Sequence, residues 1–434
     1  MPLTSQWDMY HLDAARSGDD TGEPSFLRLR GPWTAGPLDG ALYAEPLVDG
    51  ENVIIATEHD SVYDFDAVSG RQLWRVTLGR PRTSNFPCGD IKPLGITGTP
   101  IIDGGSLYVL AEVEDTPGVY RFRLAKLNPS NGATLYNRDV TPRGMDVNAE
   151  QERGALAVSH GNVIITWGGL DGDCGSYHGY LESVSESNGA EVAQWNDTEG
   201  DNQGGMWAPS GPAVDAAGNI YVTTGNGSTF DIAHFDYGDS VLEFSPSLSL
   251  TSFFAPGPPD PWPALNAADL DLGSVGPALL PNGLLFAIGK GGRGYLLKQS
   301  SLPGNSNPGG GASASAPVCA PSGGGAFSGM AVSGDTVFVP CAGGVTAVKI
   351  DSAQSFHTVW HSASGSSAPI IAGGLVWTLS LFGGRALYGL DPSTGSVAVT
   401  LTLPSTTEHF ATPSACGRRL FVGAGDFLVA FAPQ

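Results

Sequence analysis

The chain has 434 residues, of which 61 are glycine and 32 are proline, so more than one residue in five interrupts regular backbone. Only 15% of the residues are charged, and Asp and Glu outnumber Lys and Arg by 43 to 21, for a net charge of −22. This composition disfavours a helical architecture, and the negative charge would repel nucleic acid. No apolar run reaches the roughly 18 residues of a membrane span. We therefore expect a soluble, acidic, all-β protein.

One pattern of four short strands recurs along the chain. Its first copy, residues 44–79 (AEPLVDGENVIIATEHDSVYDFDAVSGRQLWRVTLG), reads as two apolar strands around an Asp-Gly turn, an alternating strand, a Ser-Gly turn and a last strand. Seven further copies begin near Thr97, Gly154, Ser210, Gly273, Ser328, Ala368 and Ala411. Eight copies of about 54 residues each suit a β-propeller, in which every blade is a four-stranded antiparallel sheet.

The two ends of the chain complete each other in this interpretation. The eighth copy stops after Phe431 and lacks a fourth strand, which residues 26–37 (FLRLRGPWTAGP) could supply. Such closure removes exposed sheet edges. We therefore predict an eight-bladed β-propeller, closed by the N-terminal strand, as a single domain over residues 1–434. The Gly-, Ser- and Pro-rich stretch 303–325 is predicted to be a surface loop, and the closed ring is expected to be monomeric.

The five cysteines give no structural zinc signal, because no two of them form a CxxC pair. They are Cys88, Cys174, Cys319, Cys341 and Cys416. The composition is typical of an exported protein, in which disulfides persist, so we expect an extracellular or periplasmic location. Cys319 and Cys341 are the first expected pair, and Cys88 is the suggested partner of Cys174. The start of the chain, MPLTSQWDMYH, does not read as a signal peptide, so the alternatives are a mature exported chain, which we favour, and a cytosolic protein.

The amino-acid sequence of the repeat resembles that of a known family. The segments LYGLDPSTG, VYDFDAVSGRQLW and LAKLNPSNGATLY are similar to the pyrroloquinoline quinone (PQQ) type of propeller repeat. That repeat occurs in quinoprotein alcohol dehydrogenases and in a non-catalytic outer-membrane assembly lipoprotein. The resemblance covers essentially the whole chain and implies the fold. It does not fix the activity, because its Asp, Gly and Trp residues are structural parts of a blade.

A site in a propeller is expected where the innermost strands begin, around one mouth of the central axis. Alignment of the copies places eight residues on or near that ring: Tyr43, Thr97, Arg153, Trp207, Asp271, Phe327, Ser366 and His409. Polar and aromatic side chains that converge on one opening favour a ligand pocket. The alternative is that they only fill the channel.

The resemblance assigns roles to particular residues near this mouth. GGMWAPSGPAVD, followed by IYVTTGNG, is similar to the quinoprotein stretch that would make Trp207 the platform under the quinone and Asn226 a calcium ligand. NAADLDLGS resembles the segment with the catalytic aspartate, which would be Asp271. A carboxylate beside a quinone could take the proton of an alcohol while hydride passes to the cofactor. Asp269 could add a calcium oxygen.

The same comparison extends to the charged residues. GKGGRGYLL resembles the segment whose basic residue contacts the quinone oxygens, with Lys290 the better match and Arg293 the alternative. Arg153 and His409 are further candidates for cofactor binding. The quinoprotein Glu of the calcium site has no counterpart near GDCGSYHGY, where Asp173 is the candidate metal ligand. The adjacent-cysteine pair and the CxxCH haem motif are also absent.

Two main functions remain open. The first is an exported oxidoreductase that uses PQQ and Ca²⁺ on an alcohol, polyol or sugar. The second is a non-catalytic propeller that binds a carbohydrate, a peptide or a partner protein. A third is a polysaccharide lyase or hydrolase with Asp271, His409, Tyr43 and Arg153 around the axis. The first predicts that Trp207 and Lys290 face one cavity wide enough for a tricyclic ring, with Asn226 and a carboxylate converging on one metal-sized point. The second predicts a plugged or solvent-filled mouth without that convergence.

Overall fold

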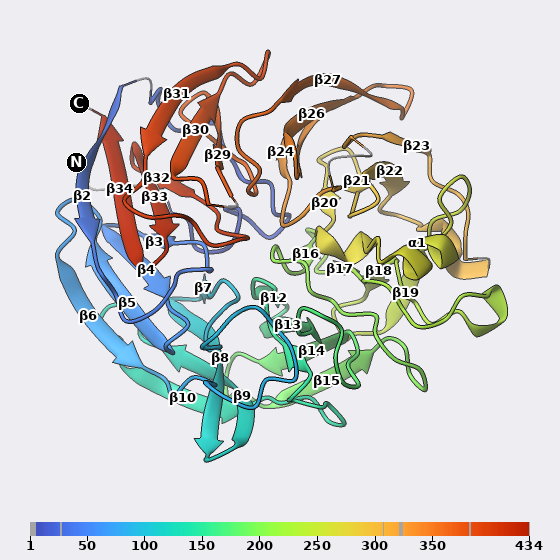
Figure 1. Ribbon diagram of the computed structural model, residues 1–434, viewed down its shortest axis with the longest axis horizontal. Coiled ribbons are helices and arrows are strands. Elements are labelled where there is room, and N and C mark those ends of the chain that lie inside the picture. Colours follow the sequence, from blue (N-terminus) through green and yellow to red (C-terminus); the bar gives the residue numbers. More distant parts are fainter. Residues whose placement is uncertain (1–5, 27, 307, 321–323, 382, 434) are drawn as a thin grey trace.

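Eight β-sheets stand around a central axis in the computed structural model, which describes residues 6–433 except 27, 307, 321–323 and 382 (Figure 1). Each sheet has four antiparallel strands, which run in chain order from the axis outward in seven of the eight sheets, and two sheets carry one additional short strand. The predicted eight-bladed, all-β propeller is therefore confirmed. None of the helices among the described residues has the length and apolar character needed to cross a membrane.

The blades follow one another along the chain. Blades 1 and 2 contain β3 (Leu47–Asp49), β4 (Asn52–Ala56), β5 (Ser61–Asp66), β6 (Gln72–Thr77), and β7 (Ile101–Asp103), β8 (Ser106–Thr116), β9 (Val119–Leu127), β10 (Thr134–Asp139). Blades 3 and 4 contain β12 (Ala157–Ser159), β13 (Asn162–Gly169), β14 (Tyr180–Ser185), β15 (Glu191–Asn196), and β16 (Ala213–Val214), β17 (Ile220–Thr223), β18 (Val241–Phe244), β19 (Leu250–Phe254). A short strand, β11 (Glu150–Gln151), also pairs with β13.

The second half of the ring repeats this arrangement. Blades 5 and 6 contain β20 (Ala278–Leu279), β21 (Leu284–Ala287), β22 (Arg293–Lys298), β23 (Ala314–Pro317), and β24 (Ala331–Ser333), β25 (Thr336–Cys341), β26 (Gly344–Ile350), β27 (Phe356–Ser362). Blade 7 contains β28 (Ile370–Ala372), β29 (Leu375–Leu379), β30 (Ala386–Leu390) and β31 (Val397–Thr402). The described helices are α1 (Trp262–Ala268), η1 (Ile232–His234), η2 (Leu272–Ser274) and η3 (Pro303–Ser306).

Blade 8 joins the two ends of the chain. It consists of β32 (Ser414–Cys416), β33 (Arg419–Ala424), β34 (Phe427–Pro433) and, as its outermost strand, β2 (Leu29–Ala35). The pairing of β2 with β34 is antiparallel, which confirms the predicted closure by the N-terminal strand. The interpretation of 303–325 as a surface loop is wrong in part, because β23 and η3 lie within it. Residues 307 and 321–323 of that stretch lie outside the described residues.

Tryptophan side chains on outer strands pack against a turn of the neighbouring blade and hydrogen-bond to it. The indole of Trp74 in β6 donates a hydrogen bond of 2.9 Å to the carbonyl of Pro129, in the turn of the next blade. That turn contains Gly132 at φ +69°, where an added Cβ would lie 2.6 Å from the Trp74 ring. Only glycine accepts this backbone conformation and this contact together. Trp360 repeats the arrangement against Pro392 and Gly395 of blade 7.

The N-terminal segment Trp7–Asp20 makes a circuit beneath the ring. Innermost strands of five blades donate one backbone N–H each to it, from Val48, Ile102, Val214, Val332 and Ile371. The carbonyls that accept these bonds belong to Trp7, Asp8, Ala14, Ser17 and Gly18. Short strand β1 (Asp19–Asp20) then runs parallel to β28 of blade 7. The segment therefore satisfies strand edges that would otherwise face the channel.

Arg16 anchors this segment from inside the protein. Its side chain is buried, and it donates hydrogen bonds to the carbonyls of Pro212 at 2.9 Å, Tyr10 at 3.1 Å and Leu156 at 2.9 Å. These acceptors lie in the segment itself and just before the innermost strands of blades 3 and 4. Beside it, the carboxylate of Glu45 accepts the indole N–H of Trp7 and the backbone N–H of His11. Together they hold the N-terminal segment against blades 1, 3 and 4.

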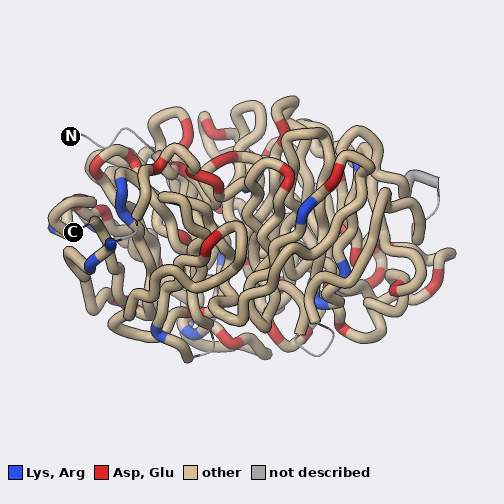
Figure 2. Tube along the Cα trace, turned by 90° about the horizontal axis from the view of Figure 1, so that it is seen from above, with Lys and Arg blue, Asp and Glu red and all other residues tan. Residues whose placement is uncertain are grey.

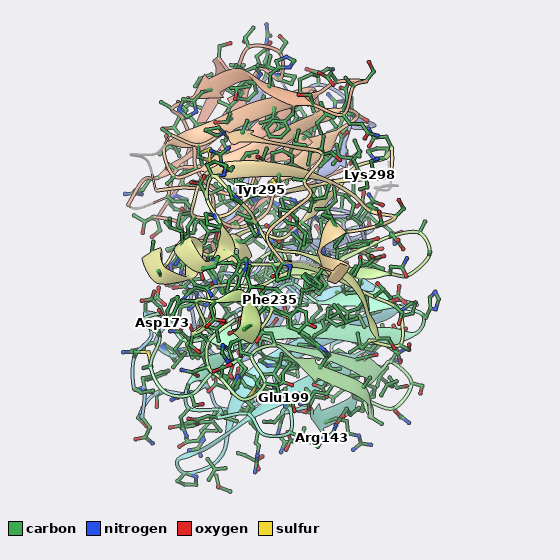
Figure 3. The ribbon with its side chains drawn as sticks, turned by 90° about the vertical axis from the view of Figure 1, so that its right-hand side faces the viewer. Arg143, Asp173, Glu199, Phe235, Tyr295 and Lys298 are labelled. Carbon is green, nitrogen blue, oxygen red and sulfur yellow. A yellow bond between two sulfur atoms is a disulfide. The ribbon has the colours of Figure 1, made fainter. Side chains whose placement is uncertain are left out.

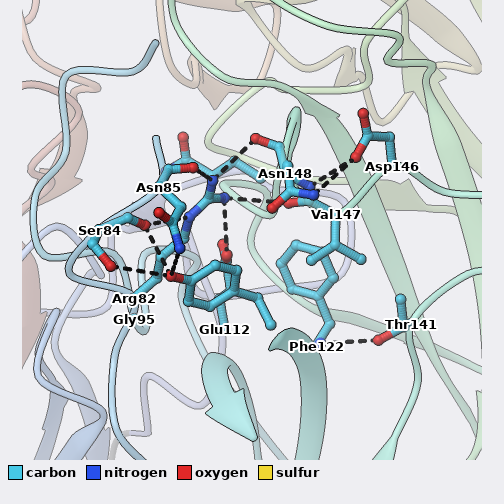
Figure 4. Close-up of polar contacts among 12 residues, drawn as sticks. Arg82, Ser84, Asn85, Gly95, Glu112, Phe122, Thr141, Asp146, Val147 and Asn148 are labelled. Atoms are coloured by element: carbon cyan, nitrogen blue, oxygen red, sulfur yellow. Dashed lines mark hydrogen bonds and ion pairs between the residues drawn. The ribbon is translucent and has the colours of Figure 1, made fainter. Parts of the chain in front are cut away.

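A second buried arginine supports loops that connect the blades (Figure 4). Arg82 is 0% exposed and contacts Glu112 at 3.3 Å, and it donates hydrogen bonds to the carbonyls of Asn85 at 2.6 Å and Asn148 at 3.2 Å. Its guanidinium thus ties the connection after blade 1 to the connection after blade 2. The first of these connections continues to Cys88.

Both expected disulfides are formed. Cys88 bonds to Cys174, and Cys319 bonds to Cys341, while Cys416 is buried in blade 8. The first bridge joins the blade 1–2 connection to the loop between β13 and β14. Figure 3 shows that Asp173, in that loop, lies at the same face of the ring as α1, whereas Lys298 lies at the opposite face.

Buried carboxyl groups make the stability depend on pH. Burial raises the pKa well above its usual value for Glu45, Asp60, Glu150, Glu152, Asp197 and Asp239. Burial also raises the pKa of Glu58 from 4.5 to about 7. A raised folded-state pKa means that the folded chain keeps protons that the unfolded chain releases, so the stability falls as pH rises.

We therefore expect the free energy of unfolding to decrease from about pH 4.5 to about pH 7, the window set by Glu58. Denaturant titrations across this window would measure it. Glu58→Gln removes one titrating group, so its stability should depend less steeply on pH than that of the wild type. A wild-type stability that is flat or rises over this range would contradict the expectation.

Candidate functional site

A cavity of about 620 Å³ opens at the mouth of the propeller, on the axis. Eight of the nine residues that the sequence proposes as a site line it: Arg153, Asp173, Trp207, Asn226, Asp269, Asp271, Lys290 and His409. Its volume lies in the range of small-molecule pockets. The exception is Arg293, whose Nε donates to Asp260 Oδ2 at 2.5 Å in a separate pocket beside α1. Arg293 is therefore wrong as an alternative to Lys290 at this cavity.

The expected ring of residues is reproduced in most positions. Arg153, Trp207, Asp271, Phe327, Ser366 and His409 line the cavity. Tyr43 and Thr97 instead line a small recess with Arg153, Phe410 and Tyr10, between the cavity and the N-terminal segment. The mouth is therefore hollow, and its inner end is closed.

Asp271 and Lys290 form an ion pair in the cavity wall. Asp271 precedes η2, Lys290 follows β21, and the distance from Lys290 Nζ to Asp271 Oδ2 is 2.5 Å. The ammonium group also donates to Asp269 Oδ1 at 2.9 Å. The other Asp271 oxygen, Oδ1, accepts the backbone N–H of Asn226 at 2.6 Å. Asp271 is 4% exposed, so its carboxylate is held by partners on both oxygens within a largely dry wall.

The protonation of this pair is set by opposing influences. Burial raises the pKa of Asp271, and the ammonium of Lys290 offsets only part of that rise. Burial lowers the pKa of Lys290, but the two carboxylates outweigh it and raise the pKa above its usual value. Lys290 therefore stays charged, while Asp271 is a stronger base than an exposed aspartate.

The backbone around Asp271 is fixed by glycine and by a second buried acid. A Cβ on Gly225 would lie 2.6 Å from Asp271 Oδ1 and 3.1 Å from the indole nitrogen of Trp207, so this position must be glycine for both side chains to fit. Asp239 accepts the N–H of Leu272, next to Asp271, at 2.7 Å. Blades 4 and 5 together therefore hold the carboxylate in place.

Trp207 presents an aromatic surface beside two cations. The guanidinium carbon of Arg153 lies 5.8 Å from the Trp207 ring centre, and Lys290 Nζ lies 5.5 Å from it. Phe410 packs at 6.3 Å from Trp207 with the ring planes tilted by 53°. Flat rings with nearby cations suit a planar ligand that carries negative charge.

The opposite part of the wall is formed by Arg153, His409 and Asp90. Asp90 Oδ1 lies 3.9 Å from Arg153 Nη2, and Asp90 Oδ2 lies 3.2 Å from His409 Nε2. The Cys88–Cys174 bridge and a hydrogen bond from the N–H of Gly89 to the carbonyl of Asp171 place Asp90 here. Neither Arg153 Nη2 nor His409 Nε2 has a hydrogen-bond partner, although both are buried. Burial lowers the pKa of His409, so its ring is neutral at physiological pH.

Cavity residues that the sequence did not propose as a site include Asp90, Asp171, Tyr177, Glu408 and Phe410. Asp90 lies two residues after Cys88, and Asp171 and Tyr177 flank Cys174. A disulfide between Cys88 and Cys174 brings these two segments together, so the expected pairing could have identified Asp90, Asp171 and Tyr177 as neighbours. Phe410 adjoins His409, which was identified.

The residues expected to bind calcium do not form a ready metal site. Asp173 accepts the hydroxyl of Tyr177 at 2.6 Å, and Asp269 and Asp271 are both paired with Lys290. In the described part of the chain, no group of three or more His, Cys, Asp or Glu side chains is placed to hold a metal ion. The donor set therefore does not fit Ca²⁺, which takes 6–8 oxygen ligands.

The surroundings of the cavity are strongly acidic. Figure 2 shows Asp and Glu residues along the loops of both faces, with Lys and Arg residues interspersed among them. Arg153 and Lys290 are therefore a small group of cations inside a protein of net charge −22. Acidic side chains also outnumber these two cations in the cavity wall, so an anionic group of a ligand would have to lie beside Arg153 or Lys290.

Comparison with known proteins gives the same repeat and fold. A PQQ-repeat family model described as outer membrane protein assembly factor BamB matches residues 30–236, just under half of the chain. No curated protein matches the chain.

Solved structures match over almost the whole chain. Quinohemoprotein alcohol dehydrogenase from Comamonas testosteroni is similar with a TM-score of 0.72 and 15% identity, over 99% of this chain and 80% of that one. A europium-containing methanol dehydrogenase is similar with a TM-score of 0.71 and 15% identity, over 99% and 98%. BamB from Moraxella catarrhalis has a TM-score of 0.58 and 14% identity, over 93% and 97%. At these identities the likeness establishes the fold.

Proposed function

We propose that this chain, a propeller built on the PQQ-type repeat, binds a flat, anionic cofactor of the pyrroloquinoline quinone class in its central mouth and oxidises an alcohol, polyol or sugar there. The observation that supports the proposal is that four residues identified from the sequence converge on one cavity. Trp207, Asn226, Asp271 and Lys290 come from separate segments and all line one cavity of about 620 Å³. A channel filled only by packing side chains would have no such opening.

The residues present suit the organic cofactor. Trp207 offers a ring for offset stacking, and Arg153, 5.8 Å from that ring, can receive a carboxylate at Nη2, which makes no hydrogen bond although Asp90 lies 3.9 Å away. Lys290 can donate to a quinone oxygen, since an ammonium group has three N–H donors and two are engaged by Asp271 and Asp269. A bound quinone supplies the hydride acceptor.

The chain itself supplies the base. Asp271 takes the hydroxyl proton of the substrate, and its raised pKa makes it a better acceptor than an exposed aspartate. Lys290 stays charged beside it and stabilises negative charge on the substrate oxygen as that proton leaves. The paired disulfides and the export-type composition support an extracellular or periplasmic location for this activity.

The proposal is tested by titrating the purified protein with PQQ and following tryptophan fluorescence. We expect saturable quenching that is lost in Trp207→Ala and kept in Trp195→Ala, which removes a tryptophan of blade 3 outside the cavity. A dye-coupled assay with short alcohols, polyols and sugars then measures turnover. Absence of saturable quenching by PQQ in the folded wild type would overturn the proposal.

A non-catalytic binding propeller is the second candidate. The observation that favours it is that both oxygens of Asp271 already have partners within the protein. Such a protein would use Trp207 and Phe410 to stack on a sugar ring. Saturable binding of carbohydrates without PQQ binding or turnover is the result that would select this function.

A further inference from the structure

The ammonium group of Lys290 lies where carboxylates of the mouth meet. It is 2.5 Å from Asp271 Oδ2, 2.9 Å from Asp269 Oδ1 and 5.5 Å from the centre of the Trp207 ring. The backbone N–H of Lys290 donates to the carbonyl of Asp271 at 2.9 Å, so the main chain holds the two residues in register. The lysine side chain is 22% exposed, and its charge therefore belongs to the cavity wall rather than to the outer surface.

Four carboxylate oxygens that would be offered to a divalent cation beside Lys290 are already engaged. Asp271 Oδ1 accepts the N–H of Asn226, and Asp271 Oδ2 and Asp269 Oδ1 accept from Lys290. Asp173 accepts the hydroxyl of Tyr177. A divalent cation at this place would have to displace an ammonium group from two carboxylates and then stand beside it, which like charges oppose.

We infer that Lys290 is a built-in cation that replaces a divalent metal ion at this site, so that the mouth binds its ligand independently of Ca²⁺ or a lanthanide. The ligand part of this inference rests on the proposed function. The exclusion of the metal ion does not, because it follows from the contacts of Lys290. Two carboxylates and one ammonium group leave a local charge of about −1, and removal of the ammonium group would leave about −2 on converging oxygens.

Terbium luminescence tests the metal part directly. Tb³⁺ is a hard cation with oxygen ligands, and it emits when a nearby tryptophan, here Trp207, transfers excitation to it. We expect no saturable, Trp207-dependent emission from the wild type in micromolar Tb³⁺. Lys290→Gln should give saturable emission, at least tenfold stronger, that Ca²⁺ displaces and that disappears when Trp207→Phe is added.

Two control variants test whether terbium emission comes from this site or from acidic residues on the surface. Lys290→Arg keeps the positive charge and should, like the wild type, give no saturable Trp207-dependent terbium emission. Lys349→Gln removes a lysine that pairs with Asp335 on the exposed surface, and it should also behave as the wild type. Circular dichroism would verify that each variant is folded. Saturable Trp207-dependent emission from the wild type, or none from folded Lys290→Gln, would overturn the inference.

The ligand part is measured with PQQ in the presence of EGTA or of added Ca²⁺. We expect the same quenching curve in both, within about twofold. Binding that requires Ca²⁺ would overturn the inference and leave the proposed function standing. Failure of PQQ to bind in either condition would overturn the proposed function, while the terbium result would still decide whether Lys290 excludes the metal ion.

Discussion

Replacing Asp271 by asparagine is expected to lower turnover by about 10²–10⁴-fold while changing the affinity for PQQ only a few-fold. Asparagine has nearly the shape of aspartate and can still accept the N–H of Asn226, but its amide cannot take a proton from the substrate. Trp207 and Arg153 keep their places, so the cofactor retains its platform. Steady-state kinetics and fluorescence titration of the same sample would measure both quantities.

The matched control is Asp260→Asn, because Asp260 pairs with Arg293 in the neighbouring pocket and does not line the cavity. Turnover of this variant should equal that of the wild type. A pH profile adds an independent signature: burial raises the pKa of Asp271, so the wild-type rate should fall as pH decreases through that pKa. An Asp271→Asn variant that keeps the wild-type rate and profile would remove Asp271 from the chemistry.

Replacing Arg16 by methionine is expected to destabilise the protein by about 3 kcal/mol. Methionine fills much of the same volume, but it cannot donate to the carbonyls of Pro212, Tyr10 and Leu156. Each would be left buried without this donor, at a cost of roughly 1 kcal/mol or more. Guanidinium titration would show a lower midpoint. The segment Trp7–Asp20 would also become more accessible to proteases, because it loses its central anchor.

Arg71→Met is the control for this change, because Arg71 is exposed. Its stability should remain within about 0.5 kcal/mol of the wild type. If Arg16→Met were as stable as Arg71→Met, the circuit beneath the ring would be held by its backbone hydrogen bonds alone. The role assigned to the guanidinium would then be wrong.

The fold could be predicted because the information is repeated. Every blade carries its own turn, such as the one at Gly132, and its own apolar strands, so eight weak signals support one architecture. β2 was predictable because the eighth copy of the repeat is one strand short and residues 26–37 are a strand-like segment outside the eight copies. The circuit of Trp7–Asp20 was not predictable in this way, since it occurs once and its bonds are made by backbone atoms that leave no sequence pattern.

The candidate site could be predicted where chemistry is carried by local motifs. Trp207, Asn226, Asp271 and Lys290 were identified from short segments, and all line the cavity. Their mutual distances were not available, because they depend on how blades 4 and 5 meet. The choice between Lys290 and Arg293 also required the structure, which turns Arg293 toward Asp260.

The circuit beneath the ring has a consequence for how this protein is made. Residues 7–20 are synthesised before all eight blades, yet their partners are spread from blade 1 to blade 7, and β2 pairs with β34, which is synthesised about 400 residues later. No partial product of the ribosome can therefore complete the ring, and contacts of such long range slow folding. The ring therefore closes only after β34 has been synthesised, so its assembly is a late event in the folding of this chain.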